Sequence, residues 1–220
     1  VFSLIIATVL WLVFHIGSRK RALVPAGLQN FLEIIVDGLR RFVVGILGPE
    51  GERFVPFLGT LFLYIFLMNL FGLIPAMKSP SSSINITAGL ALAVFSLVLY
   101  LNIRNMGMGG FLYHLAGSPK GLLGWSLVPL MFPIELLTYL ARPMTLALRL
   151  FGNIMGEDIL IAAFAFMGIA LVGVLKSPVG LPLQVPFMFL AMLTSLLQAL
   201  VFTLLSAVYI ALAVPHKAEH

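Results

Sequence analysis

The stretch Leu146-Ala-Leu-Arg-Leu-Phe-Gly-Asn153 places an arginine inside one of the most apolar regions of the chain. This region runs from Leu127 to about Val174 without a polar loop, which is too long for one upright membrane span. An ionised guanidinium in hydrocarbon is costly, and arginine cannot lose its charge by deprotonation. We therefore expect Arg149 to face water, a partner charge or an ion path, and to be central to function.

The composition predicts an all-α integral membrane protein. Of the 220 residues, 61% are hydrophobic and 10% are charged, whereas a soluble domain carries about 25% charged residues. The apolar runs lack the alternation of barrel strands, so we expect them to be helices. Cysteine is absent and no two histidines have metal-ligand spacing, so no disulfide, metal or cofactor is expected. The net charge of +5 is spread over loops and predicts no nucleic-acid partner.

Hydropathy divides the chain into about five transmembrane helices and one interfacial helix within a single membrane domain, 1–220. The first spans are expected at 1–17, 55–74 and 84–103, followed by a polar, Gly-rich loop. Because the chain begins inside an apolar run, we expect its start to be processed or truncated. Region 127–174 predicts a short helix, a kink near Pro143 and then a long tilted helix, and 187–214 predicts a last long tilted span.

Segment 25–47 has a different pattern. Polar residues recur there every three or four positions, and apolar residues fill the opposite side. This pattern predicts an amphipathic helix that lies in the headgroup plane and ends at Gly48-Pro49.

The positive charges predict the topology. If the first basic cluster is inside and the spans alternate, the N-terminus is outside and the C-terminus is cytoplasmic. We favour a bacterial plasma (inner) membrane over a thylakoid or mitochondrial one. The residues then expected inside are Arg19, Lys20, Arg21, Arg40, Arg41, Arg53, Arg104, Lys120 and Lys217, with only Lys78 and Lys176 outside.

A polar stripe lies within the long apolar region. Its members are Glu135, Arg142, Arg149, Asn153, Glu157 and Asp158. The stripe would span about 35 Å of helix, which is on the order of the bilayer thickness. Acids at both ends and a fixed cation near the middle predict an ion path with a barrier. The alternatives are that these groups only pair with one another, and that Arg142 snorkels to the inner headgroups.

Single polar residues on other spans are further candidates. Thr194 and Gln198 are four residues apart and therefore share a helix face. Gln198 needs a partner, which a helix packed antiparallel near Arg149 would supply. Asn69 predicts either an inter-helix contact or the lining of a pathway.

At Arg149-Leu-Phe-Gly-Asn153 the chain resembles subunit a of the F-type ATP synthase. The segments Phe54-Val-Pro-Phe57 and Met68-Asn-Leu-Phe-Gly-Leu-Ile-Pro75 are similar to the second span of that family. Residues 142–158 are similar to its arginine helix, and Leu197-Gln-Ala-Leu-Val-Phe202 with Tyr209 is similar to its closing helix. The resemblance covers nearly the whole chain.

The resemblance implies the proton-channel stator of a rotary ATP synthase, which is not itself an enzyme. Its partners would be the ring of c subunits, the peripheral-stalk b subunits, the remainder of the ATP synthase, the lipid bilayer and protons. Arg149 would match the stator arginine that keeps a passing ring carboxylate ionised, because a nearby cation lowers a carboxyl pKa and lipid raises it. The coupling ion, proton or sodium, depends on the surroundings of that carboxylate, which lie on another chain.

The resemblance also assigns the remaining site residues. Gln198 would pack beside the arginine, Asp158 and Glu157 would serve the outer half-channel, and Glu135 would serve the inner one. Asn153 is grouped with them, and Asn69, Arg142 and Thr194 are possible pathway lining. The sequence departs from some relatives at Ala191, where they carry His or Glu, and at Gly72, where they carry Asp. The competing functions are a self-contained ion transporter or channel and a structural subunit of a respiratory complex.

Overall fold

The computed structural model describes residues 2–18, 27–74, 79–117, 121–175 and 182–214. Within these ranges every regular element is a helix, which confirms the predicted all-α class. Four helical segments are long and apolar enough to cross a membrane, and Phe2–Gly17 is a shorter apolar helix. The elements are α1 (Phe2–Ser18), α2 (Leu28–Leu47), η1 (Pro49–Phe54), α3 (Val55–Phe71), η2 (Pro80–Ser82), α4 (Ile84–Leu115), α5 (Gly121–Leu175) and α6 (Val185–Ala213), where η marks a 3₁₀ helix.

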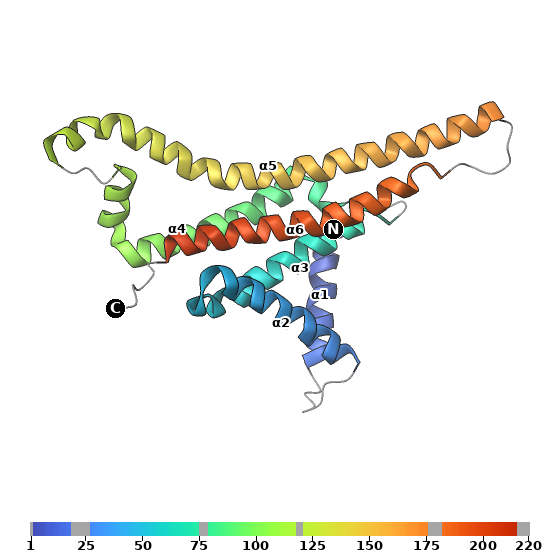
Figure 1. Ribbon diagram of the computed structural model, residues 1–220, viewed down its shortest axis with the longest axis horizontal. Coiled ribbons are helices and arrows are strands. Elements are labelled where there is room, and N and C mark those ends of the chain that lie inside the picture. Colours follow the sequence, from blue (N-terminus) through green and yellow to red (C-terminus); the bar gives the residue numbers. More distant parts are fainter. Residues whose placement is uncertain (1, 19–26, 75–78, 118–120, 176–181, 215–220) are drawn as a thin grey trace.

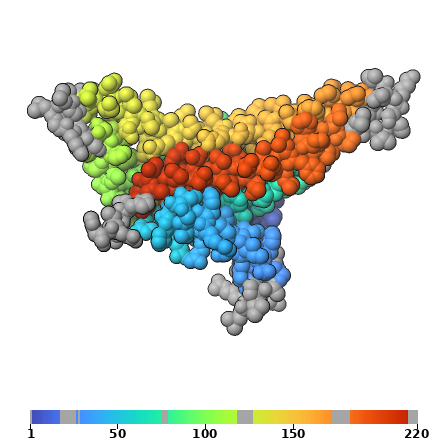
Figure 2. Space-filling view, viewed as in Figure 1, coloured from blue at the N-terminus to red at the C-terminus, as the bar shows by residue number. Residues whose placement is uncertain are grey.

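Helices α5 and α6 run side by side and antiparallel along the long axis of the molecule (Figure 1). Helix α4 packs against both of them, and α3 packs against α6. Helix α1 projects away from this layer and packs on α2 and α3. Figure 2 shows α6 as a continuous ridge between α5 and α2.

The core of the bundle forms around α6. Small side chains on one face of α6, including Ala199, Thr203 and Ala207, are fully buried and let neighbouring helices approach closely. Phe202 lies among them and is also fully buried. The opposing side chains come mainly from α3 and α5, and those with no exposed surface are Leu58, Ile65, Met68 and Leu150. The bundle therefore holds one face of α6 rigidly and leaves another face open.

Helix α2 has the amphipathic pattern expected from segment 25–47. Its buried positions Leu32, Leu39, Val43 and Leu47 follow helical spacing on one side. The polar side is exposed and carries ion pairs of Arg41 with Asp37 and of Arg40 with Glu52 in η1. The helix ends at Gly48, whose φ of 72° favours glycine. The part of this prediction that falls on 25–26 lies outside the described residues.

Helix α4 extends beyond the predicted end at 103 and continues to Leu115. The Gly-rich composition there predicts a loop, but only Gly107 leaves helical geometry, with φ 71° and ψ 165°. This region of φ and ψ is essentially restricted to glycine. A local change of direction at one residue therefore replaces the expected loop, and α4 turns toward α5.

Helix α5 is continuous where the sequence predicts a short helix, a kink and a second helix. It contains Pro129, Pro133 and Pro143 and is bowed rather than interrupted (Figure 1). Each proline removes only one backbone hydrogen bond, and packing against α4 and α6 holds the remaining turns in place.

The predicted topology depends largely on residues outside the described ranges. These are Arg19, Lys20, Arg21, Lys78, Lys120, Lys176 and Lys217. The side of the membrane that each terminus occupies therefore stays a prediction.

Candidate functional site

Contacts between α5 and α6 keep one antiparallel register over residues 142–164 of α5. Each step along α5 from one contact to the next is matched by an equal step back along α6. The pairs are Arg142 with Tyr209, Asn153 with Gln198, Glu157 with Thr194, and Phe164 with Phe187. The two helices therefore position the candidate site as one unit.

Arg149 lies on the exposed side of α5, between the exposed Leu148 and the fully buried Leu150. The ion pairs found among the described residues join side chains of α2 and η1 only. Neither Arg149 nor Arg142 is neutralised by a carboxylate of the stripe in the described part of the chain. The alternative in which the stripe consists of mutually paired charges is therefore not supported, and Arg149 is presented outward.

The partner of Gln198 is the side chain of Asn153, one turn beyond Arg149 on α5. Asn153 Nδ2 donates a hydrogen bond of 2.8 Å to Gln198 Oε1. The Gln198 side chain is 5% exposed, and its Nε2 is the one buried side-chain nitrogen or oxygen without a partner in the described residues. A buried unpaired donor costs about 1–3 kcal/mol. This arrangement leaves an N–H donor beside the arginine turn of α5.

The acids of the stripe lie at separate places along α5. Glu157 is half-buried, lies next to Thr194 of α6 and is adjacent in sequence to the half-buried Asp158. Glu135 is half-buried in the other half of the helix. The structure therefore brings Glu157 and Thr194 together and leaves Glu135 remote from them.

Asn69 is 3% exposed and joins three elements. Its Oδ1 accepts a hydrogen bond of 2.6 Å from Ser81 of η2, and its Nδ2 donates to the backbone oxygen of Ser195 in α6 at 3.5 Å. Ser79 pairs with Ser81 at 2.6 Å and donates to Met68 O at 3.1 Å. Asn69 therefore makes an inter-helix contact, and its role in a pathway stays a prediction.

The two serines that complete this network were not predicted from the sequence. Ser79 and Ser81 are buried, although the run of serines around Pro80 has the composition of an exposed loop. Asn69 could have indicated their burial. A buried amide needs hydrogen-bond partners, and the nearest polar segment along the chain is the run of serines around Pro80.

Both departures from the family pattern lie in tight surroundings. Ala191 is 3% exposed. A Cβ added to Gly72 would lie 2.6 Å from Ser79 Cβ and 3.2 Å from Ser79 Cα. The smaller side chains are therefore matched to the packing of this chain.

The ATP synthase A chain family model matches residues 1–211. The chain belongs to the ATP synthase A chain family. An ATP synthase subunit a of Protochlamydia amoebophila is 57% identical over 219 residues, which cover 100% of this chain and 81% of the relative. An ATP synthase subunit a of Solidesulfovibrio magneticus is 43% identical, and the match covers 91% of this chain and 77% of the relative.

Membership in the ATP synthase A chain family confirms the resemblance on which the expected function rests. A member of this family is the proton-channel stator subunit of the F-type ATP synthase. The two competing functions, a self-contained transporter and a structural respiratory subunit, are not favoured.

The hydrogen bond between Asn153 and Gln198 gives a first testable prediction. We expect Asn153→Leu to lower the dissociation temperature of the detergent-solubilised complex, because it leaves the buried Gln198 amide unpaired at a cost of about 1–3 kcal/mol. Gln198→Leu should lower it less, because the Asn153 amide that loses its partner is exposed. The double variant should be no worse than the worse single one, because it removes both amides. Thr8→Val, which alters an exposed hydroxyl on α1, is the control. Strictly additive losses would contradict the pairing.

Proposed function

We propose that the exposed side of α5, next to α6, is the surface along which the c-ring carboxylates pass Arg149. The observation that carries this proposal is that Arg149 is outward-facing and free of ion pairs with the described carboxylates. A fixed cation on an apolar surface is costly unless a partner supplies the opposite charge. A ring of acid-bearing helices supplies that charge.

The chemistry follows from the two environments of the ring carboxylate. Facing lipid, it is protonated, because desolvation raises its pKa. Beside Arg149 it is ionised, since two unit charges 4 Å apart attract by about 4 kcal/mol at an effective dielectric of 20. The carboxylate therefore releases its proton as it approaches Arg149 and binds another after leaving it.

Gln198 and Asn153 support this exchange. The exposed amide of Asn153 lies one turn from Arg149, on the side where a ring carboxylate would accept a hydrogen bond from it. The bond from Asn153 fixes the orientation of the Gln198 amide. We assign both residues to the arginine turn, where they hold the exchanging carboxylate in position.

The remaining acids are assigned to two half-channels. Glu157, with Thr194 and Asp158 as its neighbours, belongs to the outer one. Glu135 belongs to the inner one. We assign Asn69 and Arg142 to the lining of the proton pathway. Glu135 and Asp158 are about 35 Å apart along the helix, so a proton must be carried between them.

The exposed side of α5 suits close approach by a ring helix. Gly152 and Gly156 lie there, and a Cβ added to either would meet no atom within 4 Å. Small residues let transmembrane helices approach closely. Exposed apolar side chains, including Leu148 of α5 and Leu193 and Leu197 of α6, complete the surface.

The proposal also defines the setting of the chain. It is a non-catalytic subunit of the membrane sector, and nucleotide chemistry occurs elsewhere in the complex. Its partners are the c-ring, the peripheral-stalk b subunits and the remainder of the ATP synthase. It lies in the bacterial inner membrane with its C-terminus in the cytoplasm.

Disulfide cross-linking to the ring tests this surface, because the chain has no native cysteine. We expect Leu148→Cys, which replaces a 52% exposed side chain, to form a cross-link with a cysteine placed next to the ring carboxylate. Leu4→Cys is the matched control, because Leu4 is 71% exposed but belongs to α1, which packs on α2 and α3. Cross-linking at Leu4 alone, or at neither position, would rule out the proposed ring surface.

A further inference from the structure

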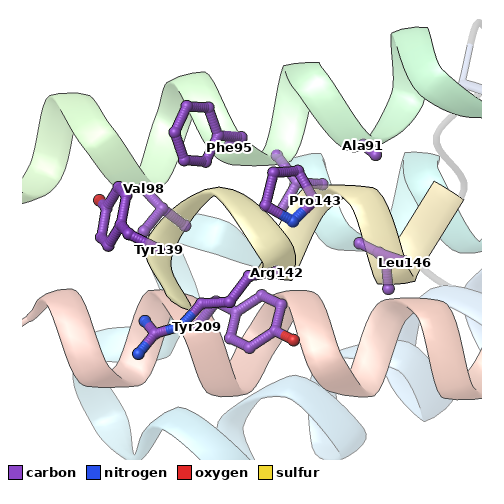
Figure 3. Close-up of a pocket in the computed structure, with 9 residues that line it drawn as sticks. Ala91, Phe95, Val98, Tyr139, Arg142, Pro143, Leu146 and Tyr209 are labelled. Atoms are coloured by element: carbon purple, nitrogen blue, oxygen red, sulfur yellow. The ribbon is translucent and has the colours of Figure 1, made fainter. Parts of the chain in front are cut away.

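A second arginine, Arg142, is held between two tyrosine rings where α4, α5 and α6 meet (Figure 3). Its guanidinium carbon lies 5.6 Å from the centre of the Tyr139 ring on α5 and 5.7 Å from the centre of the Tyr209 ring on α6. Both distances are within the range of cation–π attraction. Arg142 is half-buried, so the prediction that it snorkels to the headgroups is not needed to explain its position.

Tyr139 is itself fixed from the side of α4. Its hydroxyl accepts a hydrogen bond of 2.8 Å from Asn102 Nδ2. Its ring packs edge-on against Phe95 at 5.4 Å and against Phe111 at 5.5 Å. These two phenylalanines lie on opposite sides of the Gly107 break, so both limbs of α4 converge on one ring.

The cluster is closely packed. The remaining cavity at this place is about 10 Å³, lined also by Val98, Pro143 and Leu146. A cavity must offer about 10–15 Å³ to hold one water. This volume has room for about one water, so the main neighbours of the guanidinium are the two aromatic faces.

The cluster coincides with a turn of α5 that lacks one backbone hydrogen bond. Pro143 has no N–H, so the backbone oxygen of Tyr139 receives no helical hydrogen bond from it. Loss of that bond permits the two limbs of a helix to bend and rotate relative to each other. Tyr139 precedes this turn, and Arg142 lies within it.

We propose that Arg142 is a positioning residue: by stacking on both Tyr139 and Tyr209, it fastens the turn of α5 weakened by Pro143 to α6, and thereby restrains the rotation of α5 that sets the direction in which Arg149 points. Arg149 lies seven residues further on, about 10.5 Å along the same helix. A rotation at the Pro143 turn would move Arg149 sideways relative to the ring. This inference rests on the proposed function, because it concerns how Arg149 is presented.

Arginine suits this role better than other residues of similar size. Its planar guanidinium stacks on aromatic faces and keeps its charge, whereas a lysine ammonium is compact and strongly hydrated. We expect Arg142→Lys to retain part of the function and Arg142→Met to lose it. Tyr209→Phe keeps the ring and should be mild, and Tyr209→Leu should resemble Arg142→Met.

The test combines proton pumping with the cross-linking pattern in the intact ATP synthase. We expect Arg142→Met to lower ATP-driven pumping about threefold to thirtyfold, with normal assembly. When single cysteines replace Thr145, Leu148 or Gly152 in the Arg142→Met variant, the relative yields of their cross-links to the ring should also change. Combining Arg142→Met with Tyr209→Leu should add little to either change. Arg104→Met, an exposed arginine of α4, is the matched control and should leave pumping and the pattern unchanged.

The outcomes separate a positioning role from a purely stabilising one. A uniform loss of all cross-links, or lower assembly with an unchanged pattern, would show that Arg142 only stabilises the bundle and would overturn the inference. Unchanged pumping and an unchanged pattern would overturn it as well. Arg149→Ala is measured in parallel. If that variant pumps normally, the proposed function itself fails, whatever the result at Arg142.

Discussion

Arg149→Ala is expected to abolish ATP-driven proton pumping and proton-driven ATP synthesis while the complex still assembles. Arg149 is exposed and makes no ion pair with the described carboxylates, so its removal leaves no buried charge unpaired in this chain. The passing ring carboxylate, however, loses the cation that keeps it ionised. Removing one such electrostatic contact costs at least about 100-fold in rate. Pumping is measured in inverted membrane vesicles and normalised to assembled subunit.

Arg149→Lys separates charge from shape in the same assay. Lysine keeps a positive charge, but it is more strongly hydrated and its pKa falls when it is desolvated. We expect low residual pumping from this variant, above that of Arg149→Ala. Failure of the Arg149→Ala complex to assemble would instead support a structural role and would contradict the stator mechanism.

The second large effect is expected at Gly72, where some relatives carry an acid. Gly72→Asp should prevent stable insertion of the subunit, because the new Cβ would lie within 3.3 Å of three Ser79 atoms, two of them in the backbone. The overpacking alone costs about 1–3 kcal/mol, and a carboxylate without a cation in this polar network adds a desolvation cost. The measurement is the amount of subunit in the membrane and the dissociation temperature of the complex.

Two further variants distinguish size from charge. Gly72→Ala introduces the steric clash without the charge, so it should lower the amount of subunit in the membrane less than Gly72→Asp does. Gly89→Ala is the control for the steric part, because Gly89 is exposed on α4 and a Cβ there meets no atom within 4 Å. Normal levels of the Gly72→Asp subunit would show that the contact between Gly72 and Ser79 is not a constraint on the fold.

Much of the fold could be predicted because it depends on the composition of long segments. Hydropathy located α3, α5 and α6 to within a few residues at most ends, and helical spacing identified the amphipathic α2. The errors were local. The continuation of α4 to Leu115 depends on one glycine conformation at Gly107, and the continuity of α5 through Pro143 depends on neighbouring helices. Neither is encoded in the hydropathy of a single segment.

The candidate site was predictable only as a set of residue types. The cost of charge in a membrane singled out Arg149, and helical spacing placed Thr194 and Gln198 on one face. That Asn153 is the partner of Gln198 depends on the register between α5 and α6, which comes from packing over many turns. The roles of Tyr139, Ser79 and Ser81 depend on contacts between segments far apart in the sequence, and no local pattern marks them.

The length of α5 has a geometric consequence for how a proton crosses. The 45 residues from Leu127 to Leu171 are apolar enough for a membrane, and at 1.5 Å per residue they extend about 68 Å. Such a helix fits within about 30 Å of hydrocarbon only if it lies at about 26° to the bilayer plane. On that incline, Glu135 and Asp158 differ by about 15 Å in depth and by about 31 Å sideways, which is about three helix widths. A carrier that moved only along the bilayer normal could not visit both acids, so the carrier must also travel sideways within the membrane.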